Sequence, residues 1–461
     1  MKKYWKLLWV AIRGEEKNFT SGSINRAIFL LSVPMILEMV MEALFAVVDV
    51  FFVSRVSVNA VATVGLTESV ITVVYAIAIG LSMATTAMVA RRIGEGKKDA
   101  AAVAAVQAMV ITFSFSLIIS VAGFFYAEKI LYLMGGDDDL VAEGASYTRI
   151  IFAGNFVIMF LFLLNAVFRG AGDASIAMRA LWIANGLNIV LDPCLIFGWG
   201  PFPELGVAGA AVATNIGRGI GVIFQLFVLF GGNSIIQIGR KHLRIAWSVV
   251  KRLFEVSLGG MGQYVIASSS WIFLMRIMSE FGEQAVAGYT ISIRMLIFTI
   301  LPAWGMANAA ATLVGQNLGA SEPDRAELSV WRSAFYTMLF LLFVSIIYIV
   351  WAPDLVRIFH EGPLVVKYGT ASLRIICLGY IFFAYGMVIS QAFNGAGDTR
   401  TPTVMNFICF WAIQIPLAYW IGITQGLGPN GVFWAVAISE TILAGLCIYL
   451  FRKGRWKKIA I

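Results

Sequence analysis

The 461-residue sequence contains few of the residues on which enzymes and soluble domains rely. Only 13% of its residues are charged, whereas a soluble domain has roughly 25%. The two histidines, His242 and His360, lie far apart, and neither His-Glu-x-x-His nor Gly-x-Ser-x-Gly occurs. The four cysteines lie in or beside apolar stretches without metal-ligand spacing, which predicts small buried residues and no disulfide framework. Composition therefore argues against an enzyme and indicates no cofactor.

What the sequence has instead is long hydrophobic runs. Hydrophobic residues make up 60% of the chain, and several runs exceed the roughly 18 residues needed to cross a bilayer of about 30 Å. They predict an all-α polytopic membrane protein with roughly twelve transmembrane helices. The expected spans are residues 27–54, 61–90, 100–126, 145–168, 175–199, 206–232, 253–277, 284–314, 326–352, 366–393, 401–422 and 430–452.

Basic residues fall mainly in the loops on one side of these spans. They gather around Arg91 and Lys98, between Arg240 and Arg252, and beyond Arg452, whereas the loop at Asp137–Asp139 is acidic. The positive-inside rule then places both termini on the cytoplasmic side of the cell membrane, which agrees with an even number of spans. Orientation explains the net charge of +8, so we expect no nucleic-acid partner.

One unit, spanning nearly half of the chain, is written twice. Phe168–Asp173 reads Phe-Arg-Gly-Ala-Gly-Asp, and Phe393–Asp398 reads Phe-Asn-Gly-Ala-Gly-Asp. The same offset relates Gly206 to Gly431. Because six spans return the chain to its starting side, the two halves share one orientation and are related by a pseudo-twofold axis along the membrane normal. We expect two six-helix lobes with a site where they meet, and two complete lobes predict that a monomer suffices.

The expected organisation follows from these spans. Neither Gly-Ala-Gly-Asp loop is accompanied by a Walker-type Gly-Lys-Thr, so both are interpreted as tight turns in which Asp173 or Asp398 caps the next helix. Without a nucleotide-binding domain, an ion gradient has to drive transport. The expected segments are a cytoplasmic amphipathic segment at 1–26, an N-lobe at 27–232, a basic cytoplasmic linker at 233–252, a C-lobe at 253–452 and a basic tail at 453–461.

Polar side chains inside the spans distinguish the N-lobe. Asp49 lies in the first span, Asn188 and Asp192 share one face of the fifth, and Thr214 lies in the sixth. A charge at the centre of a span costs roughly 2.5–3.5 kcal/mol and therefore needs a partner or a function. The C-lobe residues at the positions of Asp49, Asn188 and Asp192 are the apolar Leu274, Ile413 and Leu417. This asymmetry between the lobes predicts that the N-lobe binds the coupling ion.

Asp49 and Asp192 allow two ion chemistries. Two carboxylates that face each other in a low dielectric cannot both ionise cheaply, so the pair would hold a proton. The same carboxylates, with the Asn188 carbonyl and the Thr214 hydroxyl, form an oxygen cage suited to Na⁺. The sequence does not separate these two ions. A third interpretation is that both aspartates only form hydrogen bonds that hold the bundle together.

Further residues bear on the first helix and on the substrate cavity. Glu38 and Glu42 share a helical face with Asp49 and either line the cavity or are solvated near the cytoplasmic surface. Pro34 interrupts the local hydrogen-bond ladder, either as a hinge or as a static kink. Methionine and aromatic side chains would give the cavity an adaptable wall. The candidate cavity residues are Glu38, Glu42, Met41, Gln263 and Tyr264.

Five motifs of the sequence stand out together: Ser32–Pro34, Val47–Val53, the paired Gly-Ala-Gly-Asp loops, Asn188–Asp192 and Gly206–Thr214. They resemble those of the MATE (multidrug and toxic compound extrusion) family, and the N-lobe chemistry is similar to that of its prokaryotic DinF-like branch. No Asp or Glu lies between Lys367 and Asp398, so the tenth-helix acid of the NorM-like branch is absent. Glu38 and Glu42 depart from the usual uncharged pattern.

This resemblance implies particular roles for residues of the N-lobe. It implies two lobes of six spans and a cation or proton site at Asp49, Asn188, Asp192 and Thr214. Tyr147 and Asn165 would support the same network. Pro34 would bend the first helix on protonation.

The combined expectation is a cation-coupled antiporter, driven by H⁺ or Na⁺, that exports organic, cationic amphipathic compounds by alternating access. Its partners would be small organic molecules and the lipid bilayer. The main alternative is a flippase for lipid-linked precursors from the same broad superfamily, which predicts a large, strongly basic cleft. A membrane enzyme or scaffold is the third hypothesis, and it predicts no dependence on an ion gradient.

Overall fold

The computed structural model describes residues 2–15, 18–232, 234–459 and 461, and all regular structure within them is helical. The helices of the N-lobe are α2 (Ile24–Val53), α3 (Val58–Gly94), α4 (Lys98–Leu133), α5 (Asp138–Ala153), α6 (Asn155–Ala171), α7 (Ala174–Phe197) and α8 (Val207–Phe230). Those of the C-lobe are α9 (Trp247–Ser279), α10 (Glu283–Gly319), α11 (Pro323–Arg357), α12 (Pro363–Leu378), α13 (Tyr380–Gly395), α14 (Arg400–Asn406), the π-helical η2 (Phe407–Gln414), α15 (Ile415–Tyr419), the π-helical η3 (Trp420–Thr424) and α16 (Pro429–Arg452).

These helices build the expected twelve spans. In the described part of the chain, eight continuous helices are long and apolar enough to cross a membrane, counting α14 to η3 as one, and two bent pairs raise the number to 10. The remaining two long helices, α2 with 30 residues and α9 with 33, complete each lobe. The sequence-based fold class is thereby confirmed.

Two expected spans are broken, which the hydropathy pattern did not predict. The span at 145–168 is the pair α5 and α6, bent by 41° at Gly154, and the span at 366–393 is the pair α12 and α13, bent by 59° at Gly379. The two glycines occupy equivalent positions of the two repeats, so the break belongs to the duplicated unit. Glycine weakens a helix, and Asn215 of α8 donates a hydrogen bond to the Ile150 carbonyl (2.9 Å) beside the first break.

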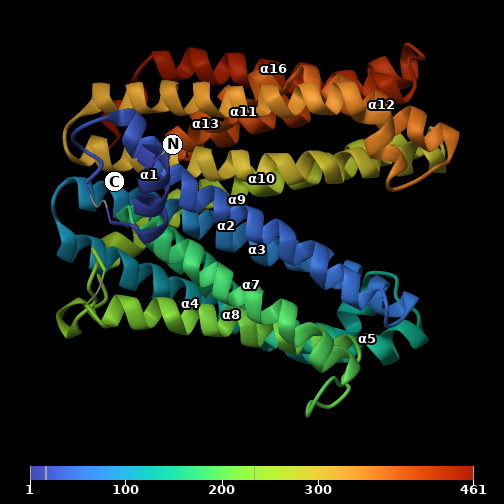
Figure 1. Ribbon diagram of the computed structural model, residues 1–461, viewed down its shortest axis with the longest axis horizontal. Coiled ribbons are helices and arrows are strands. Elements are labelled where there is room, and N and C mark those ends of the chain that lie inside the picture. The colour runs from blue at the N-terminus through green and yellow to red at the C-terminus, as the bar shows by residue number, and fades with distance from the viewer. Residues whose placement is uncertain (1, 16–17, 233, 460) are drawn as a thin grey trace.

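The two lobes meet mainly where α2 packs against α10 and where α3 packs against α9 and α10. Glycine allows both contacts: a Cβ atom at Gly80 would lie 2.6 Å from the Ser257 carbonyl oxygen, and one at Gly305 would lie 2.7 Å from the Met35 carbonyl oxygen. Gly80 and Gly305 are repeat partners. Figure 1 shows both termini at one end of the molecule and the two bundles diverging towards the other end.

The connections outside the spans are short. α9 begins at Trp247, so residues 247–252 of the expected linker are helical. The rest of the linker contains η1 (Arg240–His242), and hydrogen bonds from Lys241 and His242 hold the pKa of Asp99, at the start of α4, below its usual range. α1 (Lys2–Arg13) packs against α2 and α7, and η4 (Arg455–Lys458) lies in the tail.

Candidate coupling site and cavities

The expected ion site comes together where α7 packs between α2 and α8. The Asn188 amide donates hydrogen bonds to Asp192 Oδ1 and to Thr214 Oγ1, both at 3.2 Å. The Asp49 carboxylate lies close enough to Asp192 for their charges to repel each other. All four side chains are buried, at 8% exposed or less. Helix geometry explains the arrangement, because Asn188 and Asp192 are one turn apart on α7.

Several oxygen atoms of this cluster lack a donor. Among the described residues, Asp49 Oδ1, Asp192 Oδ2 and Asn188 Oδ1 are buried and have no hydrogen-bond partner. Buried polar atoms are normally satisfied, and unpaired acceptors in a low dielectric are costly. A proton or a cation would satisfy them.

The two residues expected to support this network are placed differently. Tyr147 of α5 is buried near the charges of Asp49 and Asp192. Asn165 of α6 instead accepts a hydrogen bond from Gln225 of α8 at 2.6 Å. Gln225 follows Thr214 by three helical turns on α8, which is roughly 16 Å along an α-helix. The structure therefore brings Tyr147 to the cluster and places Asn165 apart from it.

Glu38 and Glu42 each form an ion pair inside the N-lobe. Glu38 Oε1 lies 2.9 Å from Arg169 Nη1, and the Glu38 side chain is 1% exposed. Glu42 Oε1 lies 3.0 Å from Arg218 Nη2, and Arg218 is 3% exposed. Asn185 adds a hydrogen bond to Glu42 Oε2 at 3.3 Å. Both expected interpretations of Glu38 therefore need correction, whereas Glu42 combines an ion pair with a place on the cavity wall.

A cavity of about 330 Å³ lies between the lobes and has both of them as walls. From the N-lobe, Glu42 and Arg169 line it, and from the C-lobe, Tyr264 and Asn308 do so. Met41, an expected wall residue, packs instead against the N-lobe core.

A second cavity, of about 560 Å³, lies mainly within the C-lobe. Gln263 and Tyr264 line it as expected, and Gln263 Nε2 donates to the Asn394 side chain at 2.9 Å. Pro34 is buried inside an unbroken α2, so its role as a hinge remains a prediction.

Four charged residues of these sites were not predicted from the sequence. Arg169 and Arg218 partner the glutamates of α2, Glu68 of α3 lies near Asp49, and Glu440 of α16 lines the C-lobe cavity. A signal existed for two of them: Arg218 and Glu440 lie well inside apolar spans, where an ionisable side chain indicates a partner or a function.

Twelve spans in two similar bundles, a cavity between the bundles and charged groups buried within them define a multi-pass membrane transporter, not an enzyme. The sequence profile of the MatE family matches residues 34–194 and 261–420, one match in each lobe. The chain therefore belongs to the MatE family, the multidrug efflux transporters that the repeat and its motifs had indicated.

Known proteins of similar sequence and structure support this assignment. The chain is 28% identical to the probable multidrug resistance protein NorM of Thermotoga maritima over 95% of its own length and 94% of that protein. It is 23% identical to an FAD transporter of Shewanella oneidensis, covering 94% and 95% of the two chains. The fold superposes on an outward-facing multidrug resistance MATE transporter with a TM-score of 0.87 at 27% identity, covering 95% of this chain and 96% of the other.

Proposed function

We propose that this protein is an antiporter of the cell membrane that exports organic, cationic amphipathic compounds in exchange for H⁺ or Na⁺. The observation that carries the proposal is the group of unpaired, buried oxygen atoms at Asp49, Asn188 and Asp192. Thr214 completes the group through its hydrogen bond with Asn188. One cation or one proton, exchanged with each transport cycle, would satisfy these acceptors and couple the ion gradient to export.

The charge balance of the N-lobe supports this place for the ion. Arg169 and Arg218 neutralise Glu38 and Glu42. Asp49 and Asp192 form no ion pair with a basic side chain in the described part of the chain. Two adjacent buried carboxylates that lack a direct ion pair bind a proton or a hard cation. Carboxylate, amide and hydroxyl oxygens fit Na⁺ as well as H⁺, so the gradient that drives export identifies the ion.

The packing of the lobes supports alternating access. They are in contact through Gly80 and Gly305 and diverge away from the end that carries the termini (Figure 1). We place that end in the cytoplasm by the positive-inside rule. The structure would then correspond to an outward-open state, and Pro34 would let α2 respond to the ion. Each lobe has its own hydrophobic core, which favours a monomer as the working unit.

We also place the chain in the DinF-like branch, because its ionisable cluster lies in the N-lobe. A flippase for lipid-linked precursors, the main alternative, would need a strongly basic cleft. Among the described residues, Arg169 is the only basic side chain on the wall of the cavity between the lobes, and it is already paired with Glu38.

Export of the fluorescent cation ethidium in everted membrane vesicles tests the proposal. Proton and sodium gradients are imposed separately on wild type and on Asp49→Asn. We expect wild type to accumulate ethidium in the vesicle lumen when the lumen is acidic or rich in Na⁺. The initial rate of ethidium uptake should be at least about tenfold lower in Asp49→Asn. If protons drive export, raising the luminal pH in steps lowers the wild-type rate.

A matched control is Asp139→Asn, which neutralises an exposed carboxylate at the start of α5. It should transport as wild type does. Export by Asp49→Asn at the wild-type rate would remove Asp49 from the coupling site. Export by wild type that ignores both gradients would refute the antiporter itself.

A further inference from the structure

The cavity within the C-lobe is large enough for a small-molecule ligand. Its volume of about 560 Å³ falls within the range of roughly 300–1,000 Å³ that ligand sites occupy. Helices α9, α10, α13 and α16 supply most of its wall, and the π-helical η2 adds Phe410. π-helical turns are rare and often occur at functional sites. The cavity adjoins the one between the lobes, because Tyr264 and Trp304 line both.

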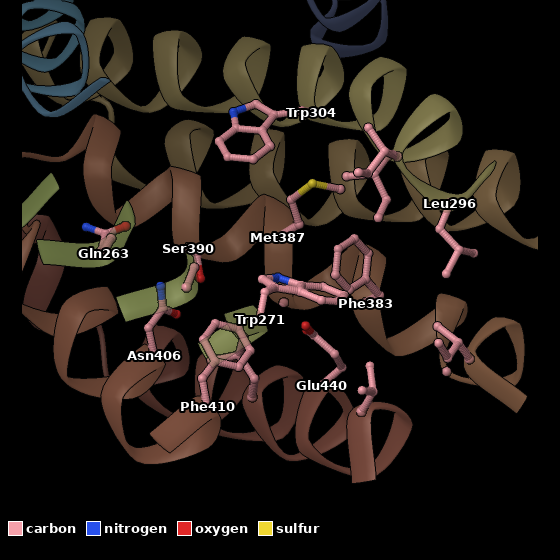
Figure 2. A pocket seen from close by; sticks show the side chains of 18 of the residues that line it. Gln263, Trp271, Leu296, Trp304, Phe383, Met387, Ser390, Asn406, Phe410 and Glu440 are labelled. Carbon is pink, nitrogen blue, oxygen red and sulfur yellow. The ribbon is translucent and has the colours of Figure 1, made fainter. Parts of the chain in front are cut away.

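Glu440 is the only charged residue among the described side chains of this wall. It forms no hydrogen bond or ion pair with any part of the chain that the structure describes, although it lies deep in the membrane-spanning part of α16. Figure 2 shows its side chain extending from α16 towards Trp271 and Phe383. A carboxyl group in such a place is stabilised in its charged form only when a cation lies against it.

The duplicated unit has an uncharged residue at the position of Glu440. Its repeat partner in the N-lobe is Asn215. Asn215 is uncharged, and its amide is used locally in a hydrogen bond to the Ile150 carbonyl. At the same position of the fold, Glu440 has no such local partner among the described residues and faces a cavity instead. The change from amide to acid therefore adds a charge without adding an internal bond.

Aromatic rings line the same cavity as Glu440. Seven of the lining residues are Trp, Tyr or Phe, and the Trp271 and Tyr289 rings stack with centroids 6.4 Å apart. Ring faces attract organic cations, and the attraction grows when water is excluded. The Tyr289 hydroxyl is fully buried and, among the described atoms, has no hydrogen-bond partner. Tyr289 thus offers an unused polar group on the same wall.

We propose that the C-lobe cavity binds a lipophilic organic monocation, with Glu440 as its counter-ion and Trp271 as an aromatic wall. The inference rests on the proposed export function and adds the site of the substrate and the residue that pairs with its charge. It divides the work between the lobes: the N-lobe holds the coupling ion at Asp49 and Asp192, and the C-lobe holds the compound. An anionic or neutral compound of the same shape gains nothing from Glu440.

Two ions of nearly the same size and opposite charge provide the test. Binding of tetraphenylphosphonium and of tetraphenylborate to purified protein is measured for wild type, Glu440→Gln, Glu440→Asp and Glu361→Gln. Glu361 is exposed in the loop between α11 and α12 and serves as the matched control. Thermal unfolding of each variant verifies that it is folded, and Trp271→Leu provides an independent variant of the same wall.

We expect Glu440→Gln to bind tetraphenylphosphonium roughly tenfold or more weakly, as for loss of a charge-assisted contact, with no loss for tetraphenylborate. Glu440→Asp should keep the preference for the cation, Glu361→Gln should match wild type, and Trp271→Leu should weaken cation binding. Equal binding of the cation by wild type and Glu440→Gln, or no binding by wild type, overturns the inference. So does a Glu440→Gln variant that binds the cation normally but no longer exports ethidium, because Glu440 would then serve coupling.

The gradient-driven ethidium assay separates this inference from the proposed function. If wild type exports ethidium and Glu440→Gln exports it equally well, only the C-lobe site is refuted. If wild type exports nothing under either gradient, the antiporter is refuted, and the binding measurements alone decide the C-lobe site.

Discussion

The ion pair between Glu42 and Arg218 offers a sharp test of how charges are held inside the N-lobe. We consider Glu42→Met, Arg218→Met and the double variant, each of which replaces a charged chain by an apolar one of similar length. The two partners are not equivalent. Arg218 is 3% exposed, whereas Glu42 is 26% exposed and lines the cavity between the lobes.

The cost of each change follows from the charge that is left behind. Glu42→Met leaves the Arg218 guanidinium buried and charged, since arginine does not lose its proton in proteins. Its Nε and Nη1 already lack partners among the described residues. Breaking a buried pair in this way costs about 3–5 kcal/mol. Arg218→Met leaves a carboxyl group that has partial access to the cavity, keeps its hydrogen bond from Asn185 and can take up a proton, so we expect roughly 1–3 kcal/mol.

Thermal unfolding of the purified variants in detergent, at pH 5 and at pH 8, measures these differences in stability. We expect the order of stability to be wild type, then Arg218→Met, then Glu42→Met, with the double variant above Glu42→Met because it no longer buries an unpaired guanidinium. Acid should restore part of the stability of Arg218→Met, since protonation removes the lone charge, and should leave Glu42→Met unchanged.

The reasoning is refuted if Arg218→Met is the less stable of the two single variants. It is also refuted if both show the same dependence on pH. Either result would mean that Arg218 is held mainly by contacts other than Glu42, such as the Phe45 ring, whose centroid lies 4.9 Å from its guanidinium carbon.

Two further predictions concern the coupling site and the contact between the lobes. Thr214→Val removes the hydroxyl that Asn188 binds and should weaken the apparent affinity for the driving ion roughly five- to tenfold in the vesicle assay. The control Thr337→Val, which removes a hydroxyl bonded only within its own helix, should leave this affinity unchanged. An unchanged affinity in Thr214→Val would exclude Thr214 from the ion site. Gly305→Val forces a Cβ to within 2.7 Å of the Met35 carbonyl oxygen and should separate the lobes at the end that carries the termini. The lobes should then approach each other at the opposite end. Pulsed EPR between spin labels at the exposed positions 133 and 359, after the native cysteines are replaced, should therefore report a shorter distance. Gly445→Val is its control because a Cβ there meets nothing within 4 Å, and equal distances in both variants would contradict the hinge-like opening.

The sequence was sufficient to predict the architecture because membrane spans and repeats are encoded locally. Apolar runs, the basic loops and the constant offset between the repeats predicted twelve helices in two lobes, and the structure has them. The polar cluster could also be predicted, because Asn188 and Asp192 lie one turn apart in a mostly apolar helix. Such regularities depend only on the period of the α-helix.

The ion pairs could not be predicted from the sequence, because a contact between two helices depends on how each helix is rotated about its axis. Arg169 belongs to a loop motif that looked like a turn, yet the structure keeps it within α6, next to Glu38 of α2. The bends at Gly154 and Gly379 were missed for a related reason: glycine is common in membrane helices, so one glycine inside an apolar run does not predict a break. The family motif grouped Asn165 with the ion site. In the structure, however, Asn165 is bonded to Gln225, which lies three turns of α8 away from Thr214 of the ion site.

The divergence of the two repeats explains why a duplicated unit need not produce two equal sites. At the position of Asp49 the C-lobe has Leu274, so its first helix cannot hold an ion in the same way. At the position of Asn215 it has Glu440, which faces a cavity that aromatic rings enclose. Each lobe has thus gained charge where the other is uncharged. In the proposed alternating-access cycle the lobes move as units about contacts such as Gly305. A charge change in either lobe would then bias the same opening and closing, which is sufficient for an ion in one lobe and a compound in the other to exchange.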